Sequence, residues 1–479
     1  MEKLKDIFLT KHFSIRNIKF SLEELFCVTV ICFLSVLLLQ NFITLLDTTV
    51  WRHDALYYID TYYNKLYTEG RWINYIFFKV LKVLPPHLVI AISLACFCFF
   101  GYRVAKDFID DELFAIIFAL ALVQIHPIYA LIHWPAVFFP NFIYLALAPP
   151  LKKVLRNWVF FVCFGILFFG SHFNFYNLLP LLFLSDLKDT SSFMKVLILW
   201  VLGFIVGCAV TEVMTFFMAG CFVRLADWRQ VHTIESLQDL FLNIQTEFQW
   251  LCSNMRGFFA RPSLKIVYCY LILHLGYLIF KNSIIKKSLL LIIAVILSLY
   301  LQLIPIGVYV MTRTAVPLYC ALLCVPLCCY YKKSLRSIAI FTICLIAFGL
   351  WCDNTNDLSC YNEITNAWQT ELKSVCSVPV LHKGLKVYLQ SGSEAEIAAS
   401  EQIIYEAIDK DLRYTEELQY NVQWVPVARS IGFRQVKIYN HKLSKDFTNL
   451  SPNELYRYGY KDGYLHLTVN QKYLDNFTD

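Results

Sequence analysis

The residues best suited to chemistry are concentrated in one stretch, TVWRHDALYYIDTYYNKLYTEGRW, which spans 49–72 and directly follows an apolar run. It combines carboxylates and cations with seven tyrosine and tryptophan rings. Aromatic rings stack on the apolar faces of pyranose sugars, and carboxylates accept hydrogen bonds from hydroxyl groups. A carboxylate can also act as the general base that removes the proton from an attacking hydroxyl. The stretch therefore suits sugar chemistry.

Two carboxylates and several sugar-contact candidates stand out within this stretch. A helix over 54–68 would place Asp54, Tyr58 and Lys65 on one face, with Asp60 on a different side. The candidates for contacts to a sugar or acceptor are His53, Tyr58, Tyr62 and Trp72. The alternative is an interfacial aromatic belt, in which the rings lie at the level of the lipid headgroups and the charges face water. Residue types alone do not separate the two.

Arg71 is the first of two arginines suited to holding a phosphate group. It belongs to EGRW (69–72), which leads into the apolar stretch INYIFFKVLKVL (73–84). That stretch predicts a short amphipathic helix along the membrane surface, so Arg71 would lie at the level of the headgroups. There the paired N–H donors of a guanidinium group can hold a phosphate.

Arg313 is the second such arginine, within MTRTAVPLYC (311–320) at a predicted outer helix end. It is the only charged residue between 288 and 331. A charged side chain inside the membrane or at its boundary is a functional candidate. Bound to a lipid-linked phosphate, Arg313 would stabilise a leaving group. The alternative is that its side chain snorkels to the headgroups.

Other polar residues lie at predicted outer helix ends, inside a span or in an outer loop. The first set could line a cavity, although hydrogen bonding between helices is the more common role: His126, His133, His172, Asn174 and Asn177. Glu212 lies within a span, so it should be paired or face a cavity. The second outer loop opens with groups that could bind a headgroup or glycan, although a solvated loop is commoner: Arg224, Asp227, Trp228 and Arg229.

Composition indicates that membrane helices position all these residues. Of 479 residues, 58% are hydrophobic and 16% charged, and the mean hydropathy is +0.53, whereas soluble domains carry about 25% charged residues. Apolar runs recur between residues 25 and 351, around the ~20 residues that a spanning helix needs. We therefore predict a polytopic α-helical membrane protein rather than a soluble protein with buried helices.

About eleven membrane segments are predicted, including a broken or re-entrant pair. The clearest segments are 25–46, 84–102, 113–125, 134–150, 196–219, 266–280, 288–309, 315–331 and 337–351. Within 157–184 the polar SHFNFYN interrupts apolar sequence, which we interpret as two half-spans joined by a turn at membrane depth. One long kinked helix is the alternative, and it would invert the orientation of everything downstream.

Positive charges predict the orientation, because cytoplasmic loops carry an excess of Lys and Arg. With a cytoplasmic N-terminus and eleven spans, the short loops rich in Lys and Arg fall inside, and the outer loops 126–133 and 171–176 contain neither. The predicted domains are a cytoplasmic N-terminus (1–24), a transmembrane domain (25–351) with outer loops 47–83 and 220–265, and an extracytoplasmic domain (352–479).

The polar tail, 352–479, predicts a small α/β domain. GLKVYLQSG (384–392) is typical of a strand that ends in a turn, and residues 393–412 form an amphipathic pattern with an N-cap serine and an acidic first turn. RQVKIYN (434–440) and YLHLTVN (464–470) alternate with the period of a strand.

Motifs for metals and nucleotides are absent from the sequence. There is no Walker loop, no GxGxxG followed by an acidic residue, and no zinc-type Cys/His spacing among the 17 cysteines. The one DxD, from Asp409 to Asp411, falls in the predicted tail helix. We predict no metal site, cofactor or nucleic-acid partner, and leave metal dependence open. Outer cysteines could form a Cys221–Cys252 bridge or one among Cys352, Cys360 and Cys376, or stay unpaired.

Several short motifs together resemble a known family. A first span is followed by an outer loop with an acidic residue and GRW before an interfacial helix. RTAVP then stands near the last spans, and YNEITNAWQTELKSV precedes GLKVYLQSG in an outer C-terminal domain. This pattern is similar to the serotype-converting O-antigen glucosyltransferases of bacteria and temperate phages. The chain departs from that family in its first loop, where HDALYY replaces an acidic pair followed by an arginine.

The resemblance implies a GT-C-like fold in the bacterial inner membrane and transfer of glucose from undecaprenyl-phosphate-glucose to O-antigen sugars on the periplasmic face. Asp54, with Asp60 in reserve, would activate the acceptor hydroxyl, and Arg71 and Arg313 would hold the departing phosphate. The anomeric centre would be inverted. The implied partners are the lipid-linked sugar, the O-antigen polysaccharide, membrane lipids, a flippase and a polyprenyl-phosphate glucosyltransferase.

Three alternatives share much of this architecture. Another transferase that uses polyprenyl-phosphate sugars would look nearly the same, and a polysaccharide polymerase also has many spans with large outer loops. A glycan flippase would instead carry charges along a central pathway, often in repeated halves. Here the charged residues gather on one face and the halves do not visibly repeat.

Overall fold

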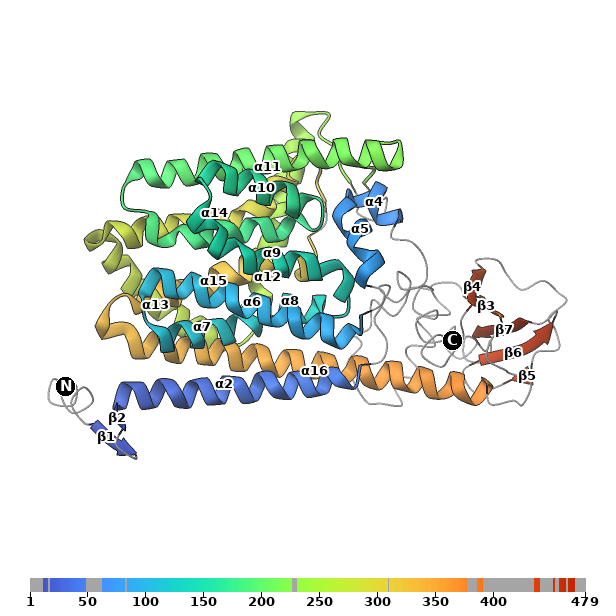
Figure 1. Cartoon of the computed structure of the whole chain (residues 1–479), viewed down its shortest axis with the longest axis horizontal. Helices are drawn as coiled ribbons and strands as arrows, with labels where there is room; N and C mark the ends of the chain where they lie inside the picture. The colour runs from blue at the N-terminus through green and yellow to red at the C-terminus, as the bar shows by residue number, and fades with distance from the viewer. Residues whose placement is uncertain are drawn as a thin grey trace. The chain divides into compact units, whose positions relative to one another are not determined.

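A computed structural model of the chain describes residues 12–15, 18–48, 63–81, 84–225, 231–308, 310–376, 386–390, 435–439, 451–452, 456–461 and 464–469. The chain divides into two compact units (Figure 1). The first comprises residues 1–40 and 62–354, and the second comprises 41–61 and 355–479. The first unit begins with a hairpin of β1 (His12–Ile15) and β2 (Ile18–Ser21).

Within the described part of the chain, five helices are long and apolar enough to cross a membrane. They are α2 (Leu22–Leu46), α6 (Pro86–Ile109), α11 (Thr190–Ala219), α14 (Ser283–Leu303) and α16 (Arg336–Cys376). A sixth crossing results if α12 (Leu237–Phe258) and α13 (Pro262–Lys281), which meet at a 106° bend, form one span. Large apolar side chains such as Val36, Ile198 and Phe217 are exposed on these helices, as expected for contact with lipid. The chain is a polytopic helical membrane protein.

Shorter helices occupy the remaining apolar segments and the first outer loop. They are α4 (Tyr63–Glu69), α5 (Trp72–Leu81), α7 (Glu112–Val123), α8 (His126–Leu131), α9 (Pro135–Val154), α10 (Asn157–Phe169) and α15 (Val316–Tyr330). Local signals set several of their ends: Pro135 and Pro317 stand in the first turns of α9 and α15. Asp111 caps α7 by accepting from the Phe114 amide. That eleven segments cross the membrane remains a prediction.

The segment between 157 and 184 forms a helical hairpin. Helix α10 is followed by a turn and by the 3-10 helix η1 (Phe173–Asp186), whose residues from 174 to 184 are buried. The ring of Phe161 lies 5.1 Å from that of Phe183, whereas Phe169 lies 5.7 Å from Phe173, so the two segments run antiparallel. The alternative of one long kinked helix is therefore wrong. Tyr176 of η1 also donates a 2.7 Å hydrogen bond to the Trp200 carbonyl of α11.

The second unit contains a five-stranded mixed sheet in the order β4-β3-β7-β6-β5. Its strands are β3 (Lys386–Gln390), β4 (Gln435–Tyr439), β5 (Ser451–Pro452), β6 (Tyr456–Lys461) and β7 (Tyr464–Val469). β3 is parallel to both of its neighbours, and β5, β6 and β7 pair antiparallel. The three predicted tail strands coincide with β3, β4 and β7. The helix predicted over 393–412 lies outside the described residues, so the α/β domain remains a prediction.

Hydrogen bonds inside the second unit join the end of α2 to a continuous α16. Asn362 donates to the Thr44 carbonyl at 2.8 Å, and Thr48 donates to the Asn362 side chain at 2.8 Å. Thr355 donates to the Asn41 side chain at 2.6 Å. Helix α16 does not end at residue 351, where the apolar sequence stops, because its polar continuation has these partners.

Three of the predicted outer cysteines form no disulfide. Cys221, Cys252 and Cys352 are free thiols. A Cys221–Cys252 bridge is therefore not formed, and the side chain of Cys376 lies outside the described residues.

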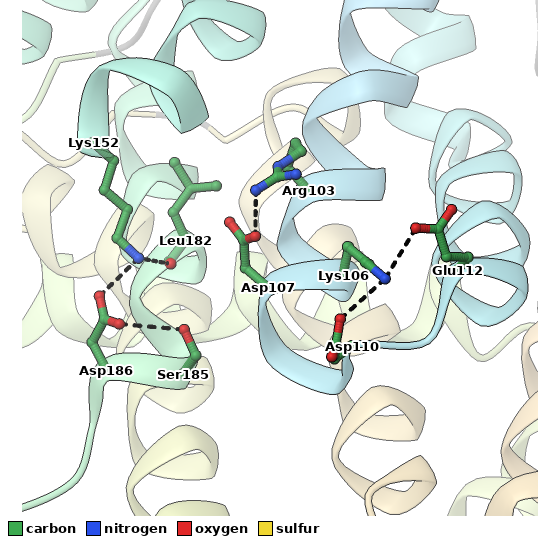
Figure 2. A network of polar contacts seen from close by, with 9 residues as sticks. All are labelled: Arg103, Lys106, Asp107, Asp110, Glu112, Lys152, Leu182, Ser185 and Asp186. Atoms are coloured by element: carbon green, nitrogen blue, oxygen red, sulfur yellow. Dashed lines mark hydrogen bonds and ion pairs between the residues drawn. The ribbon is translucent and has the colours of Figure 1, made fainter. Parts of the chain in front are cut away.

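Figure 2 shows charged side chains at the adjacent ends of α6, α7, α9 and η1. Lys106 of α6 pairs with Asp110 at 3.0 Å and with Glu112 at 3.1 Å. Lys152, near the end of α9, pairs with Asp186 of η1 at 2.7 Å. Charged residues at helix ends are typical of a boundary between membrane and water. We call the charged residues labelled in Figure 2 the ionic network: Arg103, Lys106, Asp107, Asp110, Glu112, Lys152 and Asp186.

Further contacts bring other helix ends to this side. Tyr330 at the end of α15 donates to Asp111 at 2.8 Å, and the Arg336 guanidinium lies 4.9 Å from the Tyr330 ring centroid. Lys287 of α14 donates to the Lys188 carbonyl at 2.8 Å. The segments that were predicted to lie on one membrane face from their Lys and Arg residues therefore contact one another in the first unit.

Candidate functional site

Most of the predicted residues of the first outer loop lie outside the described part of the chain. These are His53, Asp54, Tyr58, Asp60 and Tyr62. The predicted helix over 54–68 is described only from its last turns, as α4. Arg71, Trp72 and Arg313 are described, and the site can be built from them.

Arg71 lies in a buried group of charges between α4 and α5. Its guanidinium forms an ion pair with Glu69, which also pairs with Lys65 one turn earlier. The Glu69 side chain is only 5% exposed, and those of Lys65 and Arg71 are 17% and 11% exposed. Two cations and one carboxylate leave a net charge of +1, which suits an anionic ligand. Sequence analysis missed Glu69 as the partner of Arg71, although its spacing from Lys65 is that of a helical ion pair.

Gly70 lets this turn pack closely against α11. Its φ of +66° lies in the left-handed region that glycine adopts readily. A Cβ atom at this position would lie 2.5 Å from Thr211 Cγ2 and 3.0 Å from Val223 Cγ2. The Arg224 amide also donates to the Tyr67 carbonyl at 2.8 Å. The glycine of EGRW is therefore required both by backbone conformation and by packing.

Helix α5 is held by two contacts to segments distant in sequence. The Ile73 amide donates to the Gly170 carbonyl at 2.8 Å, in the turn between α10 and η1. The Asn74 side chain donates to the Val137 carbonyl at 3.0 Å, in the first turn of α9. These bonds fix the position of Arg71, which directly precedes α5.

Arg313 contacts the same two segments. It lies in the short 3-10 helix η3 (Thr312–Thr314), with its guanidinium 4.7 Å from the Trp134 ring centroid. Trp134 is the residue before α9, and such stacking is a cation–π interaction. The Asn174 side chain, in η1, donates to the Thr314 carbonyl at 3.1 Å. The start of α9 and the stretch 170–174, where the turn leads into η1, therefore anchor both arginine-bearing segments. We call Arg71, Trp72, Trp134, Asn174 and Arg313 the arginine site.

Three buried polar atoms around the arginine site have no hydrogen-bond partner among the described residues. They are Trp72 Nε1, Asn74 Oδ1 and Asn174 Oδ1. Most buried polar groups in folded proteins are hydrogen-bonded, so such atoms call for water or a ligand. One donor and two acceptors match the hydroxyl groups of a sugar. Of the predicted sugar contacts, Trp72 is the one that the structure describes.

Two of the remaining candidates are paired between helices. Asn177 and Gln302 of α14 exchange hydrogen bonds of 2.9 and 3.2 Å. His126 Nδ1 lies 3.2 Å from the Asn354 side-chain oxygen. Burial lowers the pKa of the His126 imidazole, and the Asn354 contact opposes that shift. These residues have the structural role that is more common for such positions.

The arginine site and the ionic network lie at opposite ends of α9. Trp134 immediately precedes this helix of 20 residues, and Lys152 lies two residues before its end. At 1.5 Å per residue the helix is about 30 Å long, which is about the thickness of the hydrocarbon core of a bilayer. Two polar regions separated by this length can lie at the two faces of one membrane.

Among the residues that the structure describes, no group of three or more His, Cys, Asp or Glu side chains could hold a metal ion. Comparison with protein-family models, curated proteins and solved structures finds no match to the chain. The geometry and chemistry of the arginine site are therefore the basis for any functional conclusion.

Proposed function

We propose that the protein is a GT-C-like glycosyltransferase that transfers glucose from undecaprenyl-phosphate-glucose to O-antigen sugars. One observation carries this proposal: Arg71 and Arg313 are anchored by the same two segments, next to aromatic rings and unpaired polar atoms. Guanidinium groups bind phosphate through paired donors. Indole rings and amide oxygens bind sugar. A sugar phosphate needs both kinds of group.

The orientation follows from the positive charges. Lys and Arg of the ionic network would face the cytoplasm, as in most inner-membrane proteins. The arginine site, one α9 length away, would then face the periplasm. If eleven segments cross the membrane, as predicted, the C-terminal domain would also be periplasmic and would help to bind the polysaccharide. The donor would reach the site laterally, because its lipid chain keeps its phosphate at the membrane surface.

Charge at the arginine site suits the leaving group better than the donor. Lys65, Arg71 and Arg313 with Glu69 give a net charge of +2. The donor carries a phosphodiester with one negative charge, whereas the departing polyprenyl phosphate is a monoester with a charge of about −1.5 to −2 at pH 7. Cations that match the charge developing at the phosphate lower the barrier to transfer.

The reaction then proceeds by direct displacement at the anomeric carbon. Asp54, with Asp60 as the alternative, takes the proton from the acceptor hydroxyl. The acceptor oxygen forms a bond to C1 of glucose as the bond from C1 to the phosphate oxygen breaks. The electron pair of that bond leaves with undecaprenyl phosphate, which Arg71 and Arg313 hold. Attack opposite the leaving group inverts the configuration at C1.

Expression in a bacterium with a defined O-antigen tests this function. The host must also supply undecaprenyl-phosphate-glucose and its flippase. We expect nuclear magnetic resonance of the purified polysaccharide to show a glucosyl branch that is absent from cells expressing an Arg313→Ala variant at the same level. An unmodified O-antigen accompanied by glucosylated lipid A would show that another acceptor is used. An unmodified envelope would contradict the proposal.

A further inference from the structure

Helix α12 buries a stripe that contains three polar residues. Its buried residues recur along one stripe: Asn243, Glu247, Leu251, Asn254 and Phe258. The exposed side carries large apolar residues, with Leu237 at 75%, Phe241 at 69% and Phe248 at 63%, alongside exposed polar residues such as Gln245 and Gln249. A helix on a soluble surface buries its apolar stripe instead and rarely exposes such large rings. The exposed apolar side chains of α12 would contact lipid, because the chain is a membrane protein. Amphipathic helices of this kind lie in the membrane surface.

The inward stripe contacts the end of α14 and the segment after it. The Asn243 amide donates to the Ile304 carbonyl at 2.9 Å. Three residues after Leu251, the Asn254 amide donates to the Tyr300 hydroxyl at 3.1 Å. Glu247 lies on this stripe between the two asparagines. The stripe therefore presents amide and carboxyl groups toward α14.

Glu247 is the exception to the pairing along this stripe. The residue is 2% exposed, and neither carboxyl oxygen has a hydrogen-bond partner among the residues that the structure describes. A buried carboxyl group without a partner is strongly disfavoured, because it loses its hydration and gains nothing in return. An apolar residue would pack there at lower cost, so a carboxyl group at this position points to a ligand that supplies donors.

We propose that Glu247 binds hydroxyl groups of a lipid-linked sugar in a site between α12 and α14. The carboxyl group would accept from two neighbouring hydroxyls, and the side chains of Asn254 and Tyr300 would supply further donors and acceptors. Among the described residues, Glu247 belongs to no group of three or more His, Cys, Asp or Glu side chains that could hold a metal ion. This inference rests on the proposed function in one respect, the choice of a sugar as the headgroup.

Entry of the headgroup requires α12 to move outward. The helix ends at Phe258, and a break of a few residues with a 106° bend separates it from α13. Such a break allows α12 to turn as a unit while its apolar face stays in lipid. A substrate anchored by its own lipid chain could then reach the stripe without leaving the membrane surface.

Covalent labelling of Glu247 tests the site without any transfer reaction. A hydrophobic carbodiimide reacts with protonated carboxyl groups in apolar surroundings and leaves an acylurea that mass spectrometry locates. The protein would be purified in a polyoxyethylene detergent, with dodecyl glucoside as the probe and dodecanol as the control. We expect labelling at Glu247 to slow at least about tenfold with saturating dodecyl glucoside and to stay unchanged with dodecanol. Equal labelling with both additives, or no labelling at all, would overturn the proposal.

Two matched variants complete the test. Glu247→Gln should lose the label and bind dodecyl glucoside at least about tenfold more weakly by calorimetry, since Gln keeps the shape but replaces one carboxyl oxygen with an NH2 group, which cannot accept a hydrogen bond from a sugar hydroxyl. Glu235→Gln, at an exposed position just before α12, should behave like the unchanged protein. Unchanged affinity in Glu247→Gln would overturn the proposal. If dodecyl glucoside slows the labelling of Glu247 in a protein that transfers no sugar, the Glu247 site is supported and only the proposed function is refuted.

Discussion

Replacing Gly70 with alanine tests whether the turn that carries Arg71 is seated on α11. Gly220 provides a matched control, because its φ of +71° is almost the same as the +66° of Gly70. A Cβ atom at Gly220 would meet nothing within 4 Å, whereas at Gly70 it would lie 2.5 Å from Thr211 Cγ2. The two variants share the backbone cost and differ in the clash.

The expected magnitudes follow from these two terms. A left-handed conformation costs an L-residue ~1–2 kcal/mol, so Gly220→Ala should lower the free energy of unfolding by about that amount. Overpacking adds ~1–3 kcal/mol, so Gly70→Ala should lose correspondingly more. It should also reduce transfer, because relief of the clash displaces Arg71. Adding Thr211→Ser, which removes Cγ2, should restore part of both losses.

The assay is reversible unfolding in mixed micelles, followed by helical circular dichroism, alongside the transfer rate of each variant in lipid vesicles. Thr211→Ser alone serves as the baseline for the double variant. Equal destabilisation by Gly70→Ala and Gly220→Ala would refute the packing of this turn on α11. A double variant no better than Gly70→Ala would locate the clash elsewhere.

Three further predictions concern chemistry and pH. Arg313→Ala should raise the KM for the lipid-linked donor at least about tenfold, and Arg313→Lys should recover only part of it because Lys stacks less well on Trp134 and forms no bidentate bond; unchanged donor kinetics would assign Arg313 to snorkelling. Asp54→Asn should abolish transfer in a protein that remains inserted and folded, and full activity would rule out Asp54 as the base. Burial lowers the pKa of His126 in the folded state. The free energy of unfolding should therefore fall as the pH drops below the unfolded pKa of about 6.5, and His126→Gln should flatten that dependence. An equal slope in both proteins would contradict this role of His126.

Hydropathy predicted the helical part of the fold well, because the apolar length of a segment in a membrane protein is set by the bilayer. The interruption SHFNFYN correctly indicated a turn between α10 and η1, because its polar residues break the apolar sequence. The end of α16 could not be predicted in this way. Its polar part continues to Cys376 through hydrogen bonds such as that from Asn362 to Thr44, which link residues far apart in sequence.

The residue types of the candidate site could be predicted from the sequence, but the ion pair between Arg71 and Glu69 could not. Arg71 of EGRW and the isolated Arg313 were both predicted as phosphate ligands, and the segments that carry them both contact the start of α9 and the stretch 170–174 that leads into η1. That Glu69 partly neutralises Arg71 depends on a turn geometry that spacing does not specify. The inward side of α12 was missed for a different reason. Amphipathic periodicity shows that two faces differ, but it does not show which face meets the protein when the outside is lipid.

Transfer by the purified protein in lipid vesicles tests the central claim most directly. The vesicles would contain undecaprenyl-phosphate-glucose labelled in the sugar, with purified O-antigen polysaccharide added outside, and the label in the polysaccharide would be measured with its anomeric configuration. We predict transfer that inverts the anomeric centre, depends on both Arg71 and Arg313, and releases undecaprenyl phosphate in equal amount. Label that stays on the lipid, or transfer with equal rate when both arginines are replaced by alanine, would contradict the account.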